Sequence, residues 1–149
     1  MSLKETITQD MKVALRARDQ DRLRAIRFLQ AAIQRLEIDE RTTLDDAGVA
    51  STVQKLIKQS QDALEQFAKA GRDDLAKREK DDIAVWQSYL PEQLSNAELD
   101  KLITEALAET GASTLKDMGR VMAALKSKAQ GRTDMGKLSA QVKTRLAGG

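Results

Sequence analysis

The chain contains one proline, Pro91, and it lies within five residues of the only tryptophan, Trp86, and the only tyrosine, Tyr89. Proline has no backbone N–H and disfavours helix at the residue before it. A helix arriving from Asp73 should therefore end near Leu90. This position constrains the fold more than any other, because a helix cannot run through it without a break.

A second helix start follows the proline almost at once. Ser95 can cap that helix, and Glu98 stands three residues later, which completes a capping box. We therefore predict that the stretch from Trp86 to Ser95 joins two helical bodies. The first is a four-helix N-terminal bundle over residues 1–92, and the second is a three-helix C-terminal bundle over residues 93–149.

The rest of the chain is patterned for helices. Apolar residues recur at intervals of three and four, which indicates amphipathic helices, and only eight glycines accompany the single proline. We predict an all-α fold without an internal repeat. The seven helices are expected to begin near Ser2, Asp21, Thr43, Asp73, Ser95, Thr114 and Asp134.

Two patterns within these helices leave alternatives open. The stripe from Val49 to Phe67 has nearly heptad spacing, so it could form either a coiled-coil seam or part of a bundle core. Gly119 lies inside a predicted helix, where glycine costs about 1 kcal/mol relative to alanine. Close approach of another helix is the favoured reason for it, and approach of a ligand backbone is the alternative. Leu115 is expected to face inward in the same helix.

The composition excludes several kinds of site. The chain has no cysteine and no histidine, so disulfides, thiolate metal sites and His-based triads are impossible. Neighbouring carboxylates in one helix point about 100° apart and do not share a site. No glycine-rich phosphate loop occurs. We find no self-contained active site, and we predict neither a metal nor a cofactor.

The sequence also gives an expectation about location. The N-terminal residues lack the apolar core of a signal peptide, and no segment approaches the ~20 apolar residues of a membrane span. We therefore expect a cytoplasmic protein that does not associate with membranes.

Charge is unevenly distributed along the chain. The net charge is only +2, yet residues 113–149 carry eight basic and two acidic side chains, whereas residues 36–112 carry nine basic and seventeen acidic ones. Such asymmetry favours an anionic partner for the basic segments. All four aromatic residues precede Pro91, so the basic C-terminal part has no platform for base stacking. Recognition of structured RNA by shape and backbone is the expected mode. An acidic protein partner and a solvated basic surface without a ligand are the alternatives.

Candidate RNA-binding residues come from two regions. In the first, Arg24 and Arg27 lie on the exposed side of a predicted helix. In the second, the turn from Gly131 to Asp134 opens a basic helix whose N-terminus could hold a phosphate. The candidates of the C-terminal region are Arg120, Lys126, Lys128, Arg132, Lys137 and Lys143. We expect that Arg132→Glu weakens RNA binding and leaves the melting temperature nearly unchanged.

Several motifs together resemble the GatB/YqeY family. They are the helix segment with Gly119 and Met122, the turn with Gly131 and Asp134, and the segment around Pro91. Gly71-Arg72-Asp73-Asp74-Leu75-Ala76 and the arginine-rich helix at 23–27 resemble the free-standing YqeY branch. The likeness spans nearly the whole chain. It implies an all-helical protein with a four-helix and a three-helix body.

The resemblance also implies a function. In the tRNA-dependent amidotransferase, which amidates Glu-tRNA(Gln) or Asp-tRNA(Asn), the B subunit carries a similar tail that helps to hold tRNA. The residues thus predict a non-catalytic helical module that binds tRNA or another structured RNA. A protein-interaction adaptor for an amidotransferase or an aminoacyl-tRNA synthetase is one alternative. A carbon–nitrogen ligase with glutamine as amide donor is another. The oligomeric state is not predicted.

Overall fold

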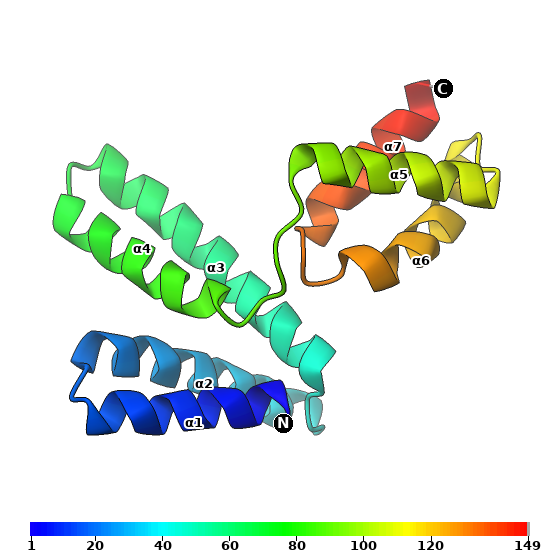
Figure 1. Cartoon of the computed structure of the whole chain (residues 1–149). Coiled ribbons are helices and arrows are strands. Elements are labelled where there is room, and N and C mark those ends of the chain that lie inside the picture. The colour runs from blue at the N-terminus through cyan, green and yellow to red at the C-terminus, as the bar shows by residue number, and fades with distance from the viewer. Residues whose placement is uncertain (149) are drawn as a thin grey trace. The chain divides into compact units, whose positions relative to one another are not determined.

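The computed structural model describes residues 1–148, which form seven α-helices, one 3-10 turn and no strand (Figure 1). The prediction of an all-α fold is therefore confirmed for these residues. The chain divides into two compact units, Met1–Leu90 and Pro91–Gly149. The elements are α1 (Leu3–Arg16), α2 (Gln20–Glu40), α3 (Asp46–Lys69), α4 (Asp73–Gln87), α5 (Asn96–Thr110), η1 (Leu115–Asp117), α6 (Met118–Ala129) and α7 (Met135–Gly148).

The first unit contains two helical hairpins, α1 with α2 and α3 with α4 (Figure 1). Their apolar faces meet in one core that includes most of the predicted stripe on α3, so the core interpretation of that stripe is confirmed. The indole N–H of Trp86 donates to the carbonyl of Ala25 at 2.9 Å. The hydroxyl of Tyr89 donates to Asp10 at 2.7 Å, and burial raises the pKa of this phenol. Both bonds fix the end of α4 to the first hairpin.

Two helix starts in this unit differ from the sequence prediction. Asp45, not Thr43, caps α3, and its carboxylate accepts from the N–H of Gly48 at 2.8 Å. Asp46 instead accepts from the N–H of Leu3 at 2.8 Å, a contact 43 residues distant in sequence. The N-cap of α4 is Arg72, so Asp73 is the first helical residue rather than the cap. Several neighbouring residues at these helix starts are of types that favour the N-cap position. Contacts with distant parts of the chain decide which of them becomes the cap.

The second unit has its own core. Ser95 caps α5 by accepting from the N–H of Glu98 at 3.1 Å, and Gly111 ends the helix at φ +66°. Both features follow the prediction. The buried core residues come from α5, α6 and α7, and they are Leu99, Ile103, Ala106, Val121, Leu125, Ala129, Leu138, Val142 and Leu146.

The start of α6 departs from the prediction. Thr114 and Asp117 do form a capping box, but the residues they enclose make a 3-10 turn, and the α-helix itself begins at Met118. Leu115 lies in this turn and is 48% exposed. Its predicted inward orientation is therefore wrong, because the tighter turn rotates it away from the stripe that α6 buries.

Gly119 also behaves differently from the prediction. It lies in the first turn of α6, it is exposed, and a Cβ placed on it would meet no heavy atom within 4 Å. No helix of the described chain approaches it, so the expected close packing at this position is wrong. The glycine leaves that side of α6 open.

The open space around Gly119 leads to a prediction for stability. Gly119→Ala should raise the free energy of unfolding by about 0.5–1 kcal/mol, because alanine loses less backbone entropy in a helix and meets no neighbour here. Urea unfolding measures the change. A loss of stability would show that some group packs on this glycine after all.

Candidate nucleic-acid interface

The turn between α6 and α7 orders the start of the basic C-terminal helix. Gly131 is buried and has φ +79°, a conformation that favours glycine. The carboxylate of Asp134 accepts from the N–H groups of Gly136 and Lys137 at 2.8 and 3.3 Å. Asp134 therefore caps α7 as predicted, and its negative charge occupies the helix N-terminus that had been considered for a phosphate.

Arg132 fastens this turn to the segment that follows Pro91. Its Nε donates to the carbonyl of Glu92 at 3.0 Å, and a terminal nitrogen donates to the carbonyl of Lys128 at 3.5 Å. The N–H of Leu94 donates in return to the carbonyl of Arg132 at 2.8 Å. The amide of Gln93 reaches the carbonyl of Gly131 at 2.9 Å. Arg132 thus has a structural role that the sequence analysis did not foresee.

Arg120 is likewise engaged. It donates to the carboxylate of Asp117 at 2.6 Å and to the carbonyl of Thr110 at 3.3 Å. The pKa of Asp117 is lowered to about 2 by the N–H of Ser113, by Arg120 and by the N–H of Thr114. Asp117 therefore stays charged at the start of α6, where a negative charge is favourable.

Four lysines on α6 and α7 remain available to a ligand. Each is exposed, and within residues 1–148 none of their ammonium groups has a hydrogen bond or an ion pair. Arg145 on α7 differs, because it donates to the hydroxyl of Thr104 at 2.9 Å. The available lysines are Lys126, Lys128, Lys137 and Lys143.

These cations belong to two similar 12-residue segments that begin 17 residues apart in the sequence. Residues 117–128 read DMGRVMAALKSK, and residues 134–145 read DMGKLSAQVKTR. The two segments agree in Asp, Met, Gly, Ala and Lys at corresponding positions, and most of the remaining pairs are conservative. The prediction of a chain without repeats was therefore wrong. The signal was present in the sequence and could have been found by comparing the chain with itself.

The two copies of the repeat also correspond in structure. Val121 and Leu138 are both 0% exposed, and Leu125 and Val142 are 1% and 0% exposed. Because equal spacing along two helices gives equal angular positions, the basic residues correspond as well. Lys126 matches Lys143, Arg120 matches Lys137, and Lys128 matches Arg145. The repeat therefore places each basic group at the same angle to the buried face of its helix.

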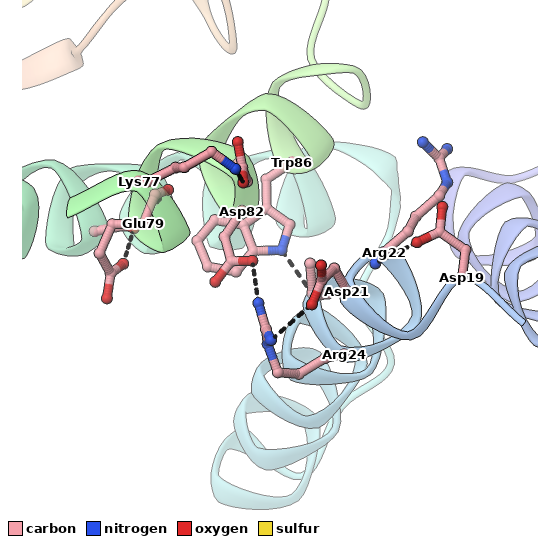
Figure 2. A network of polar contacts seen from close by, with 11 residues as sticks. Asp19, Asp21, Arg22, Arg24, Lys77, Glu79, Asp82 and Trp86 are labelled. Carbon is pink, nitrogen blue, oxygen red and sulfur yellow. Dashed lines mark hydrogen bonds and ion pairs between the residues drawn. The ribbon is translucent and has the colours of Figure 1, made fainter. Parts of the chain in front are cut away.

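The two candidates of the first unit have different environments. Arg24 donates to Asp21 at 3.3 Å and to Asp82 of α4 at 3.2 Å (Figure 2). Burial raises the pKa of Asp82, although Arg24 favours its charged form. Arg27 is exposed and has no hydrogen bond or ion pair within the described residues. Because Arg24 is already paired with two carboxylates, it is a weaker candidate than Arg27 for binding an anion.

Two other kinds of site were sought in residues 1–148. No three acidic side chains gather in a way that could hold a metal ion. No helix there has the length and apolar character needed to cross a membrane.

Comparison with known proteins gives a consistent likeness. A family model described as Yqey-like protein matches residues 4–146. The chain is 34% identical over 125 residues to "Altered inheritance of mitochondria protein 41, mitochondrial" of Pyrenophora tritici-repentis, which covers 80% of this chain and 69% of that protein. The protein of the same name from Lachancea thermotolerans is 35% identical over 106 residues, covering 69% of this chain and 57% of its own length. The chain thus spans roughly half to two thirds of these relatives.

The expected cytoplasmic location is contradicted by these comparisons. The relatives from Pyrenophora tritici-repentis, Lachancea thermotolerans and Eremothecium gossypii are all named as mitochondrial proteins. The expectation rested on the composition of one N-terminal segment. The matched regions cover only 69% and 57% of the first two relatives. The composition of residues 1–12 in this chain is therefore a poor basis for predicting location.

Arg132 should contribute to stability. Arg132→Ala removes two charge-assisted hydrogen bonds to backbone carbonyls and should lower the free energy of unfolding by about 1–2 kcal/mol. This reverses the earlier expectation for Arg132→Glu, which should also lower the melting temperature. Urea unfolding of the variant tests it, with Lys128→Ala as the matched control that removes a free cation nearby. Equal stability of both variants and the parent would contradict the structural role.

Asp117 should make stability depend on acid pH. Its pKa is lower in the folded chain than the ordinary 3.8, so its charge stabilises the fold above pH 3.8 and this contribution is lost as pH falls towards about 2. Asp117→Asn should therefore lower the melting temperature at pH 7, and the difference from the parent should shrink towards pH 2. Asp62→Asn, at an exposed residue of α3, should show no such trend.

Proposed function

Because the chain belongs to the Yqey-like protein family, we propose that it is a helical module that binds tRNA or another structured RNA through the lysines of its second unit. The observation that carries this proposal is the repeat in α6 and α7. It presents Lys126 and Lys143 at corresponding positions, exposed and without a partner among the described residues. Free ammonium groups of this kind release counterions from a phosphate backbone when they bind it.

The expected recognition is of backbone and shape. Residues 91–149 contain no aromatic side chain, so bases cannot stack on this unit as they do on single-strand readers. Lysine also contacts phosphate as a point charge and carries no sequence information in that contact. A folded RNA, which offers phosphates at fixed separations, suits such a surface better than a flexible strand.

The proposal includes a relation to the tail of the amidotransferase B subunit. The segments around Gly119 and Gly131 carry that resemblance, and both lie in the repeat region. We further propose that the four helices before Pro91 and the three after it act as separate bodies. The compact units Met1–Leu90 and Pro91–Gly149 support this division, as do the bonds of Glu92, Gln93 and Leu94 to the turn at 131–132.

The adaptor alternative loses part of the surface on which it rests. It relies on the acidic residues 36–112 and on the stripe from Val49 to Phe67, and the residues that begin that stripe are in the core. Val49 and Val53 are both 0% exposed. A partner could not reach these two residues without unfolding the unit.

RNA binding should depend on salt and on individual lysines. The parent chain should bind labelled tRNA with an affinity that falls steeply between about 50 and 200 mM salt. Lys126→Ala and Lys143→Ala should each reduce the log–log slope by about 1. Their effects should be similar, because the repeat gives the two lysines the same position on their helices. Fluorescence anisotropy at several salt concentrations measures both.

The matched control is Lys80→Ala, which removes an exposed lysine of α4 in the first unit. It should leave the slope unchanged. Absence of tRNA binding at low salt, or a flat salt dependence in the parent, would overturn the proposal. Equal losses in all three variants would mean that binding is a diffuse effect of net charge.

A further inference from the structure

Helix α2 exposes large apolar side chains where the sequence predicted a polar face. Phe28 is 59% exposed and Ile38 is 66% exposed. With Ala31 they fall at positions i, i+3 and i+10 of one helix, which places them on the same side. Single exposed apolar residues are common, but an aligned set marks a surface that contacts something.

The ring of Phe28 is held in place. It stacks on Trp86 with ring centroids 6.0 Å apart and planes at 26°. Trp86 is 3% exposed and is itself anchored by its bond to the carbonyl of Ala25. The exposed face of Phe28 is therefore held in one orientation. Binding a ligand there would cost little side-chain conformational entropy, and such preorganisation favours binding.

Phe28 stands beside a groove between α2 and α3, which we call the α2–α3 groove. It has a volume of about 350 Å³, and its apolar lining includes Phe28, Ala32 and Leu36 of α2 and Leu56 of α3. Thr52 also lines it, but its hydroxyl already donates to the carbonyl of Gly48 at 2.9 Å. The inner surface therefore calls for apolar contact.

Charged side chains form the rim of the α2–α3 groove. Arg35 of α2 and Lys55 of α3 line it from opposite sides, and Asp39 lies near the end of α2. All three are exposed, and none has a hydrogen bond or an ion pair within residues 1–148. Two free cations on facing helices create a site for a carboxylate, while Asp39 offers a place for one cation.

We propose that the α2–α3 groove binds an amphipathic helix of another protein. The apolar face of that helix lies against Phe28 and Leu56, and an acidic side chain lies between Arg35 and Lys55. The lining residues on α2 run from Phe28 to Asp39, about 16 Å at 1.5 Å per residue, which matches three turns of a bound helix. This is the helix-in-groove mode of recognition.

RNA fits the α2–α3 groove less well. One face of Phe28 is covered by Trp86, the lining offers no second aromatic ring for stacking, and Asp39 would repel phosphate. A second copy of this chain also fits less well. Two other large apolar residues exposed in the first unit, Val13 and Leu15 of α1, are flanked by Lys12 and Arg16, which would bring cations to the cationic rim.

A selection experiment tests the proposal with the full chain as target. A phage library of randomised helical peptides should yield binders with apolar residues at i, i+3 or i+4 and i+7 and an Asp or Glu beside them. Phe28→Asp should weaken a selected peptide about tenfold or more, as expected for loss of an aromatic anchor. Lys55→Glu should weaken the same peptide and improve its version with Lys in place of the acidic residue.

The matched control is Leu15→Asp, which places the same charge on an exposed apolar residue of α1 and should leave peptide affinity unchanged. The charge swap with Lys55→Glu keeps the proposal testable if Phe28→Asp unfolds the chain. Failure to enrich any helical peptide, or peptides that bind all variants equally, would overturn it. Loss of tRNA binding or of a dimer in Phe28→Asp would assign the groove to RNA or to a second copy, and would equally overturn it. RNA binding by the lysines stands or falls separately.

Discussion

The ten residues from Trp86 to Ser95 supply the contacts on which both units depend. Trp86 and Tyr89 close the first unit through bonds to Ala25 and Asp10. Beyond the proline, Gln93 and Leu94 bond to the turn at 131–132, and Ser95 starts α5. Because proline stops the helix here, side chains on either side are free to serve different cores. The same indole that closes the first unit also fixes Phe28, so the position of the α2–α3 groove follows from this stretch.

Much of the fold could be predicted because helical periodicity determines which residues are buried. The stripe on α3 was found in this way, and the turn at Gly131 was recognised from its residue types. What failed depends on contacts distant in sequence. The predicted start of α3 at Thr43 was replaced by a cap at Asp45, and the neighbouring Asp46 bonds to Leu3. The exposure of Phe28 is not predictable from periodicity, which gives no sign that α2 and α3 leave a groove between them.

The charges of the candidate site also depend on contacts that the sequence pattern does not reveal. Counting cations pointed to the second unit, but it treated arginine and lysine alike. The guanidinium group offers five donors in a planar fork, and Arg120 and Arg132 use theirs on a carboxylate and on backbone carbonyls. The lysines of α6 and α7 make no such bonds within the described residues. Which cations are free to meet an anion therefore follows from the geometry of turns, which composition does not contain. The repeat was accessible from the sequence and is the best guide to the pairs that correspond.

The extent of the family match bears on why the chain has two units. The match runs over residues 4–146 and so includes both. The repeated lysines lie entirely in the second unit, which has its own core, so binding RNA through them requires nothing of α1 to α4. The first unit is therefore free for the different contact that we propose for it. The α2–α3 groove is the part of that unit where apolar lining, a fixed aromatic ring and unpaired rim charges occur together. A module that holds RNA on one body and a protein helix on the other would bring the two ligands together without any chemistry of its own.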